Sequence, residues 1–258
     1  MVKPQVAYSP DFAGLLQLVA FLRGPEGCPW DKKQTSDSLT RQFLEECYEV
    51  IEAIDDSDPR AISEELGDVL LHVAFQIRIA AEHKDFSPTD VFQRLQEKLV
   101  NRHPHVFGTT KVQEAEEVET NWEELKRIER KGTGESSLDG VPKTMPSLSY
   151  AQAIQIRAGH VGFDWQNVDA VLDKVNEEIK DAATHKEREA EIGDLFFALV
   201  NLSRWHDIDA ESALRKANKR FYGRFRHMEQ WATNRDRNFS TLSVEEKNIL
   251  WNQAKETV

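Results

Sequence analysis

The chain has 258 residues, and its 45 acidic and 33 basic side chains give a formal net charge of −12. An acidic chain repels a phosphate backbone, so we expect no nucleic-acid partner. The two cysteines, Cys28 and Cys47, are too few for a disulfide framework and favour a reducing, cytoplasmic location.

The first apolar stretch, Phe12 to Leu22, has the length of the apolar region of a secretory signal. Asp11 precedes it, Gln17 interrupts it, and no small-residue cleavage site follows. It is also too short to cross a bilayer. We therefore predict an amphipathic helix and no membrane partner.

Helical signals then recur along the chain. Asp58-Pro59 and Ser87-Pro88 each place a capping side chain before a proline suited to the first helical position. Apolar residues follow at helical spacing over 62–77, and again over 172–179 and 195–202. No alternating strand pattern bounded by hairpin turns stands out. These patterns predict an all-α fold.

Glycine, serine and proline gather in residues 132–147, which we predict to be a linker. It separates an N-terminal domain over 1–131 from a C-terminal domain over 148–258. Both halves contain paired acids, then Glu-x-Gly-Asp, then a basic pair, then a tryptophan with a lysine four residues later. Motifs recurring in the same order predict a tandem repeat of two related helical-bundle domains.

The paired acids predict two helical hairpins. Carboxylates three residues apart share one face of a helix. In the first half the two pairs are equally far along the chain from Ser57, and in the second half from Lys186. A hairpin turn at each of these residues therefore places the two pairs opposite each other. The eight acids are Glu46, Glu49, Glu65 and Asp68 in the first half, and Glu178, Asp181, Glu191 and Asp194 in the second.

Four converging carboxylates repel one another, and a hard divalent cation resolves that conflict. We therefore predict Mg²⁺ at these sites, with Mn²⁺ as a substitute. Gly67 and Gly193 precede an acid in each half, although a glycine inside a helix costs about 1 kcal/mol relative to alanine. We expect them to allow close approach of helices. A single Glu-x-x-Glu is more often a solvated surface, but two symmetric copies favour a site.

Together with Cys28-Pro29-Trp30-Asp31, Gln34-Thr35 and the segment from Arg102 to Phe107, these motifs resemble those of MazG-type nucleoside triphosphate pyrophosphohydrolases in their two-domain form. The resemblance covers nearly the whole chain. It implies an all-α fold, Mg²⁺ dependence, homodimerisation and hydrolysis of (d)NTP to (d)NMP and pyrophosphate. It also implies that the eight acids are the metal ligands.

A triphosphate needs cations besides the metal, and a tryptophan can stack on its base. Ordinary exposed charges and core tryptophans are the alternative explanation. The resemblance adds weight to Lys174, Lys216, Trp251 and Lys255. The candidate nucleotide-binding residues are Lys98, Arg102, Trp122 and Lys126 in the first half, and Lys174, Lys216, Lys219, Arg220, Arg224, Trp251 and Lys255 in the second.

A glutamate outside the metal set can act as general base, and the candidates are Glu45, Glu64 and Glu177. The first acid set is the more complete, but the second half has the richer basic set, and the resemblance implies hydrolysis there. We therefore favour the second half as the main catalytic site.

Two other functions stay open. A di-iron oxidoreductase commonly uses Glu-x-x-His, and none of the eight histidines has a glutamate three residues before it. A non-catalytic, metal-binding helical interaction module would hold a structural ion, or nothing, between the acids.

Overall fold

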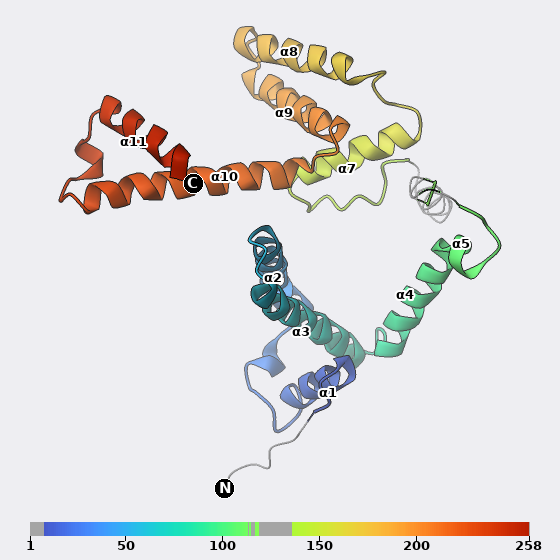
Figure 1. Cartoon of the computed structure of the whole chain (residues 1–258). Coiled ribbons are helices and arrows are strands. Elements are labelled where there is room, and N and C mark those ends of the chain that lie inside the picture. The colour runs from blue at the N-terminus through green and yellow to red at the C-terminus, as the bar shows by residue number, and fades with distance from the viewer. Residues whose placement is uncertain (1–7, 113, 115–116, 119–135, 258) are drawn as a thin grey trace. The chain divides into compact units, whose positions relative to one another are not determined.

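The computed structural model describes residues 8–112, 114, 117–118 and 136–257. The chain divides into two compact units, Met1–Ala115 and Glu116–Val258. The described residues form helices and short 3-10 turns, with no strand among them, which confirms the all-α prediction (Figure 1). No helix in the described part of the chain is long and apolar enough to cross a membrane.

The first unit is built on a helical hairpin. Helices α2 and α3 pack against each other, and α1 and α4 pack on α3 (Figure 1). Ser57 lies in the turn between α2 and α3 with φ of 54°, so the predicted fold about this residue is confirmed. The elements are α1 (Phe12–Leu22), η1 (Asp31–Lys33), α2 (Ser36–Asp55), α3 (Pro59–His83), α4 (Pro88–Arg102) and α5 (Pro104–Phe107).

Side-chain caps begin both helices of this hairpin. Thr35 and Ser38 form a capping box, in which Ser38 N donates to Thr35 Oγ1 at 3.1 Å and Thr35 N donates to Ser38 Oγ at 3.0 Å. Asp58 Oδ1 accepts from Arg60 N at 2.9 Å, directly before the proline that starts α3. The sequence signals at residues 58–59 therefore mark a true helix start.

An ion pair joins the loop before α2 to the C-terminal part of α3. Arg23, whose side chain is only 6% exposed, donates from Nη2 to Glu82 Oε2 at 2.8 Å and from Nε to Oε1 at 3.2 Å. Its Nη1 donates to the carbonyl oxygens of Asp31 at 2.6 Å and Gln34 at 3.0 Å. Arg23 therefore fixes the Cys-Pro-Trp-Asp loop, and with it the start of α2, against α3.

The second unit repeats the hairpin theme. Helices α8 and α9 pack against each other, α7 packs on α9, and α10 contacts both α7 and α9 (Figure 1). The turn at residues 185–187 confirms the predicted fold about Lys186. Helix α11 packs along α10. The elements are α7 (Ser147–His160), α8 (Val168–Thr184), α9 (Arg188–Trp205), α10 (Ala210–Thr233), η2 (Phe239–Thr241) and α11 (Val244–Thr257).

A second ion pair occupies a comparable place in this unit. Arg204, near the end of α9, binds Asp164 in the loop before α8 through two hydrogen bonds. Arg157 of α7 donates to the carbonyl oxygen of Leu138 at 3.1 Å, so residues within the predicted 132–147 linker are held on α7. Ion pairs thus anchor the loop preceding the hairpin in both units.

The Arg23–Glu82 pair predicts a pH dependence of stability. The hydrogen bond from Arg23 lowers the pKa of Glu82 below that of an unfolded glutamate. A lowered folded-state pKa gives stability that is present above the unfolded pKa of about 4.3 and is lost as pH falls through the folded value. We expect Glu82→Gln to flatten the acid side of a melting-temperature profile between about pH 5 and 3. Glu97→Gln, on exposed α4, is the control, and equal flattening by both variants would contradict this assignment.

Candidate metal and nucleotide site

The first hairpin gathers three carboxylates from two helices. One carboxylate oxygen each of Glu46, Glu49 and Glu65 lies within 4.8 Å of the others. Partial desolvation raises the pKa of Glu46, and the charges of Glu49 and Asp68 raise it further. Desolvation and Glu49 likewise raise the pKa of Glu65. Asp68 is thus electrostatically coupled to the cluster without belonging to its tightest group.

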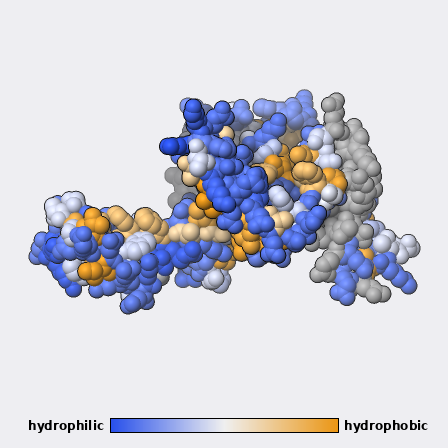
Figure 2. Space-filling model, turned by 90° about the horizontal axis from the view of Figure 1, so that it is seen from above, coloured by the Kyte–Doolittle hydropathy of each residue, from blue (hydrophilic) through white to orange (hydrophobic). Residues whose placement is uncertain are grey.

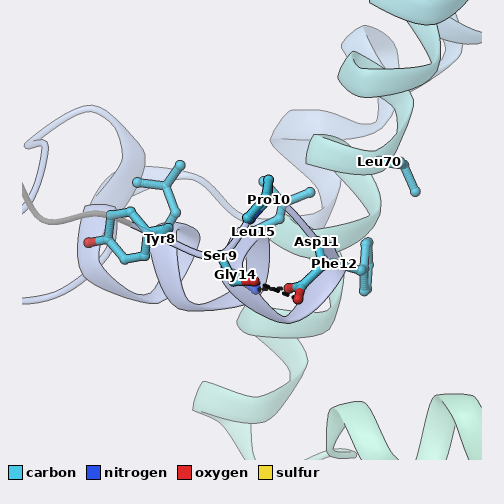
Figure 3. Close-up of a pocket in the computed structure, with 9 residues that line it drawn as sticks. Tyr8, Ser9, Pro10, Asp11, Phe12, Gly14, Leu15 and Leu70 are labelled. Atoms are coloured by element: carbon cyan, nitrogen blue, oxygen red, sulfur yellow. Dashed lines mark hydrogen bonds between the residues drawn. The ribbon is translucent and has the colours of Figure 1, made fainter.

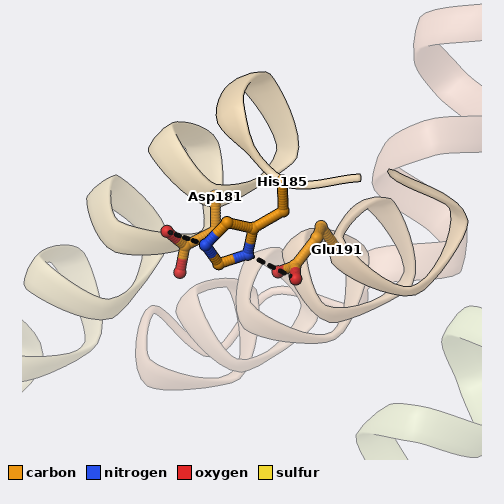
Figure 4. Close-up of side chains that lie close together, drawn as sticks. All are labelled: Asp181, His185 and Glu191. Carbon is orange, nitrogen blue, oxygen red and sulfur yellow. Dashed lines mark hydrogen bonds and ion pairs between the residues drawn. The ribbon is translucent and has the colours of Figure 1, made fainter. Parts of the chain in front are cut away.

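The second hairpin gathers a matching set. Oxygens of Glu178, Glu191 and Asp194 lie within 4.8 Å of one another, and Glu178 is buried. Oxygens on opposite sides of Mg²⁺ are about 4 Å apart, because each bond is about 2.1 Å long. Three hard oxygen donors at this spacing fit one such ion. Asp181 forms a second possible ligand group with His185 and Glu191 (Figure 4).

Two side chains neutralise part of the second cluster. Lys174 Nζ lies 2.7 Å from Glu178 Oε1 and 2.8 Å from Glu177 Oε1, and these hydrogen bonds raise the pKa of Lys174. His185 Nδ1 lies 2.7 Å from Glu191 Oε1, and Nε2 lies 3.7 Å from Asp181 Oδ1. The hydrogen bond to Glu191, with the charge of Asp181, raises the pKa of His185.

The first cluster has no comparable cation. Among the described residues, no lysine or arginine pairs with Glu46, Glu49, Glu65 or Asp68, and the one basic neighbour is His72, 3.8 Å from Glu46. His185 is not among the residues predicted from the sequence. Its position four residues after Asp181, beside the hairpin midpoint, is the signal that would have found it.

A cavity of about 670 Å³ adjoins the second cluster. Glu178 and Asp194 line it, as do two cations, Lys174 and Arg204. The remaining walls are mainly apolar and aromatic. A mainly apolar cavity with a few charged groups is the usual form of a small-molecule site.

A second cavity, of about 390 Å³, lies at the start of α1 (Figure 3). Tyr8, Phe12, Leu15 and Leu70 are among its lining residues. Its one acid, Asp11, caps α1 by accepting from Gly14 N at 2.8 Å. None of the described members of the two acid clusters lines this cavity.

Most predicted nucleotide-binding residues are not among the described residues that line the cavity. Lys98 and Arg102 are on α4 of the first unit, and Trp122 and Lys126 lie outside the described residues. Among the described candidates, Lys174 alone lines the cavity. The residues that do not line it in the second unit are Lys216, Lys219, Arg220 and Arg224 on α10, with Trp251 and Lys255 on α11.

The α10 and α11 residues form contacts of their own. The Arg224 guanidinium lies 5.8 Å from the ring centre of Trp251, and Trp251 lies 5.3 Å from the ring centre of Phe221. Trp251 also packs against the core between α10 and α11, and Lys255 Nζ lies 3.4 Å from Asn252 Oδ1. The structure therefore brings Arg224 and Trp251 together without bringing them into the cavity.

The three candidate general bases lie beside the clusters. Glu45 is exposed and pairs with Arg41 at 2.9 Å, and Glu177 pairs with Lys174. Glu64 is exposed next to Glu65. None of the three belongs to a metal-ligand group within the described part of the chain.

The expected role of the two helical glycines is wrong for this chain taken alone. A Cβ atom built on Gly67 or Gly193 would meet nothing within 4 Å, so no described helix approaches closely there. The spacing of residues along a helix says nothing about the distance to a neighbouring helix. Each of these glycines, next to Asp68 or Asp194, therefore has space beside it that no other part of the described chain fills.

Comparisons with known proteins decide the family. A model described as the MazG nucleotide pyrophosphohydrolase domain matches residues 34–107, which include the first cluster. The MazG nucleoside triphosphate pyrophosphohydrolase/pyrophosphatase of Thermotoga maritima is 42% identical over 95% of both chains. The chain belongs to the MazG family. The nucleoside triphosphate pyrophosphohydrolase of Escherichia coli K12 is 40% identical over 93% of this chain and 95% of its own. The uncharacterised protein YabN of Bacillus subtilis is 43% identical over 99% of this chain but 54% of its own length.

The open space beside the MazG glycines gives a stability prediction. We expect Gly67→Ala and Gly193→Ala each to raise the free energy of unfolding by about 1 kcal/mol, because alanine restricts the unfolded chain and clashes with nothing. Urea unfolding measures this. Gly14→Ala is the matched control and should destabilise, since its Cβ would lie 1.9 Å from the carbonyl oxygen of Ser9. A stability loss in Gly193→Ala would show that a neighbour fills this space in solution.

Proposed function

We propose that this MazG protein is a Mg²⁺-dependent nucleoside triphosphate pyrophosphohydrolase that converts (d)NTP to (d)NMP and pyrophosphate. The observation that carries the proposal is the Glu178–Glu191–Asp194 cluster beside a cavity large enough for a nucleotide. The named relatives support the same activity. Mn²⁺, with similar oxygen preference, is the expected substitute.

In this proposal, one set of side chains binds the metal ion and the phosphates, and another accepts a proton. Glu178, Glu191 and Asp194, with Asp181, are the proposed ligands, and bound Mg²⁺ supplies neutralisation of phosphate charge. Lys174, which pairs with Glu177 and Glu178, would meet a phosphate oxygen of the bound substrate.

Glu177, which lies outside the proposed ligand set, would act as general base. It accepts a proton from a water molecule whose oxygen bonds to the α-phosphorus. The bond between the α-phosphorus and the bridging oxygen to the β-phosphate breaks, and pyrophosphate leaves with the electron pair. Glu45 and Glu64 are the corresponding candidates if the first unit, with ligands Glu46, Glu49, Glu65 and Asp68, is also active.

We place the main catalytic site in the second unit. Its cluster adjoins the cavity and has Lys174 in contact, whereas the first cluster pairs with no lysine or arginine among the described residues. A triphosphate needs such cations more than it needs a fourth fully matched carboxylate.

A homodimer completes this site in our proposal. Of the two cations lining the cavity, Arg204 is held by Asp164, so Lys174 alone is available for several phosphate charges. The basic residues on α10 and α11 lie outside the cavity. These helices also expose apolar side chains such as Phe221 and Tyr222, and apolar patches lie among hydrophilic ones on the surface (Figure 2). A second copy that buries this face would bring its basic residues to the cavity.

The chemistry is tested by comparing matched carboxylate variants. Loss of an outer-shell partner of a metal ligand costs about 10- to 100-fold, so loss of a ligand itself in Asp194→Asn should reduce pyrophosphate release at least about 100-fold. Asp68→Asn should retain most of the activity. Ion chromatography separates pyrophosphate from orthophosphate for each (d)NTP, and circular dichroism checks the fold.

Three results would contradict parts of the proposal. Release of orthophosphate and NDP would refute attack at the α-phosphorus. Inactivity of Asp68→Asn with an active Asp194→Asn would move catalysis to the first unit. Mg²⁺ binding with no turnover of any nucleotide would favour the non-catalytic interaction module.

Shared sites are tested by mixing inactive variants. If cations come from a second copy, mixing Asp194→Asn with Lys255→Ala should restore about a quarter of wild-type activity, since half of the dimers are mixed and each has one intact site of two. The double variant, Asp194→Asn with Lys255→Ala in one chain, mixed with itself is the control. No recovery from the mixture, with Lys255→Ala inactive, would place both groups in one chain.

A further inference from the structure

The cavity beside the second cluster has walls that phosphate chemistry does not require. Phe163, Trp165 and Phe197 line it, and Phe163 is 82% exposed, so the rest of the unit leaves this ring uncovered. Phosphates bind cations and N–H groups, whereas a flat heterocycle gains by packing on aromatic rings. The walls therefore suit the base of a nucleotide.

Gln155 of α7 presents a buried, unused acceptor at this cavity. Its side chain is 6% exposed, and Nε2 donates to the carbonyl oxygen of Phe197 at 2.9 Å. That bond sets the orientation of the amide, and Oε1 is left buried without a hydrogen-bond partner among the described residues. A buried acceptor without a donor is destabilising, and its place in a cavity wall suits a ligand that donates a hydrogen bond.

A second glutamine on the same helix shows what a purely structural amide looks like. Gln152 donates from Nε2 to the carbonyl oxygen of Ile208 at 3.0 Å, and its Oε1 accepts from Ala210 N at 2.9 Å. Both of its amide atoms are used by the fold to hold the start of α10. In Gln155, three residues later, Nε2 is bonded within the fold and Oε1 has no partner among the described residues.

Asn201 of α9 supplies a hydrogen-bond donor, where Gln155 supplies an acceptor. It is 7% exposed and lines the same cavity. Its Oδ1 accepts from Arg204 Nε at 3.0 Å and from Nη2 at 2.7 Å, which orients the amide. No described residue accepts a hydrogen bond from Nδ2, so this group remains a donor. Arg204 is itself held by Asp164.

We propose that Gln155 and Asn201 read the hydrogen-bonding edge of the substrate's base, an inference that rests on the proposed function. Gln155 Oε1 accepts from a base N–H, and Asn201 Nδ2 donates to a ring nitrogen or carbonyl oxygen. Every ordinary nucleobase offers a donor beside an acceptor on its Watson–Crick edge. Trp165 and Phe163 provide the apolar walls, and the substrate class is a nucleotide with an unblocked base edge.

Gln155→Leu tests the acceptor, with tripolyphosphate as a probe that has the phosphates and lacks the base. We expect KM for the best dNTP to rise about 10-fold with kcat nearly unchanged, as for loss of uniform binding. The inhibition constant of tripolyphosphate should stay at the wild-type value. Gln152→Leu is the matched control, and it should lower the melting temperature without changing the ratio of the two constants. Equal weakening of dNTP and tripolyphosphate by Gln155→Leu would overturn the proposal.

Asn201→Asp tests the donor without removing the contact to Arg204. The substitution keeps an oxygen for the guanidinium and replaces the base-facing donor with an acceptor. We expect the ranking of kcat/KM among the four dNTPs to change, because different bases then match the edge. An unchanged ranking in a folded variant would overturn the proposal even if Gln155→Leu does not fold.

A binding measurement separates this proposal from the proposed hydrolysis. Deoxynucleosides alone, titrated into the full chain by NMR, need no turnover. Shifts that vanish in Gln155→Leu would support the base site even if wild type released no pyrophosphate. Absence of nucleoside-dependent shifts, with hydrolysis intact and Gln155→Leu behaving as wild type, would leave the function standing and refute the base site.

Discussion

Repulsion between carboxylates held level across a helical hairpin is the constraint on which the rest of this structure depends. Each hairpin directs several acids to one place, and like charges at such short range destabilise the fold unless something offsets them. In the first hairpin, desolvation raises the pKa values of Glu46 and Glu65, and the charges of the other two predicted metal ligands, with no lysine or arginine paired to them among the described residues, raise these values further. The second hairpin offsets the repulsion with Lys174 and His185. The two halves therefore differ in charge balance more than in backbone plan.

An ion pair outside the acid cluster also stabilises each hairpin, because it attaches the preceding loop to the second hairpin helix. Arg23–Glu82 and Asp164–Arg204 each attach the preceding loop near the C-terminal part of the second hairpin helix. Both arginines also bind further groups, carbonyl oxygens for Arg23 and the Asn201 amide for Arg204. Multiple hydrogen bonds from a planar guanidinium hold these loops more rigidly than a lysine would.

The hairpins and their centres were predictable because they follow from spacing along the chain. Caps at Asp58 and the symmetric placement of acids about Ser57 and Lys186 need only helix geometry. The cavity, the spare oxygen of Gln155 and the separation of Trp251 from the acids depend on how α7, α9, α10 and α11 pack. Such contacts join residues more than 40 positions apart, as Gln155 and Phe197 are, and periodicity contains no information about them. The same limit explains the wrong expectation for the two helical glycines.

Arg204 has a consequence for the base contact proposed for Asn201. The guanidinium orients the Asn201 amide, and Asp164 orients the guanidinium. An amide reversed by 180° exchanges its donor and acceptor while the residue stays asparagine. In the proposed base site, a change in the Asp164–Arg204 pair would therefore alter base preference while Asn201 itself stays unaltered. Residue 201 would supply the amide that contacts the base, but residues 164 and 204 would determine which amide atom faces the base.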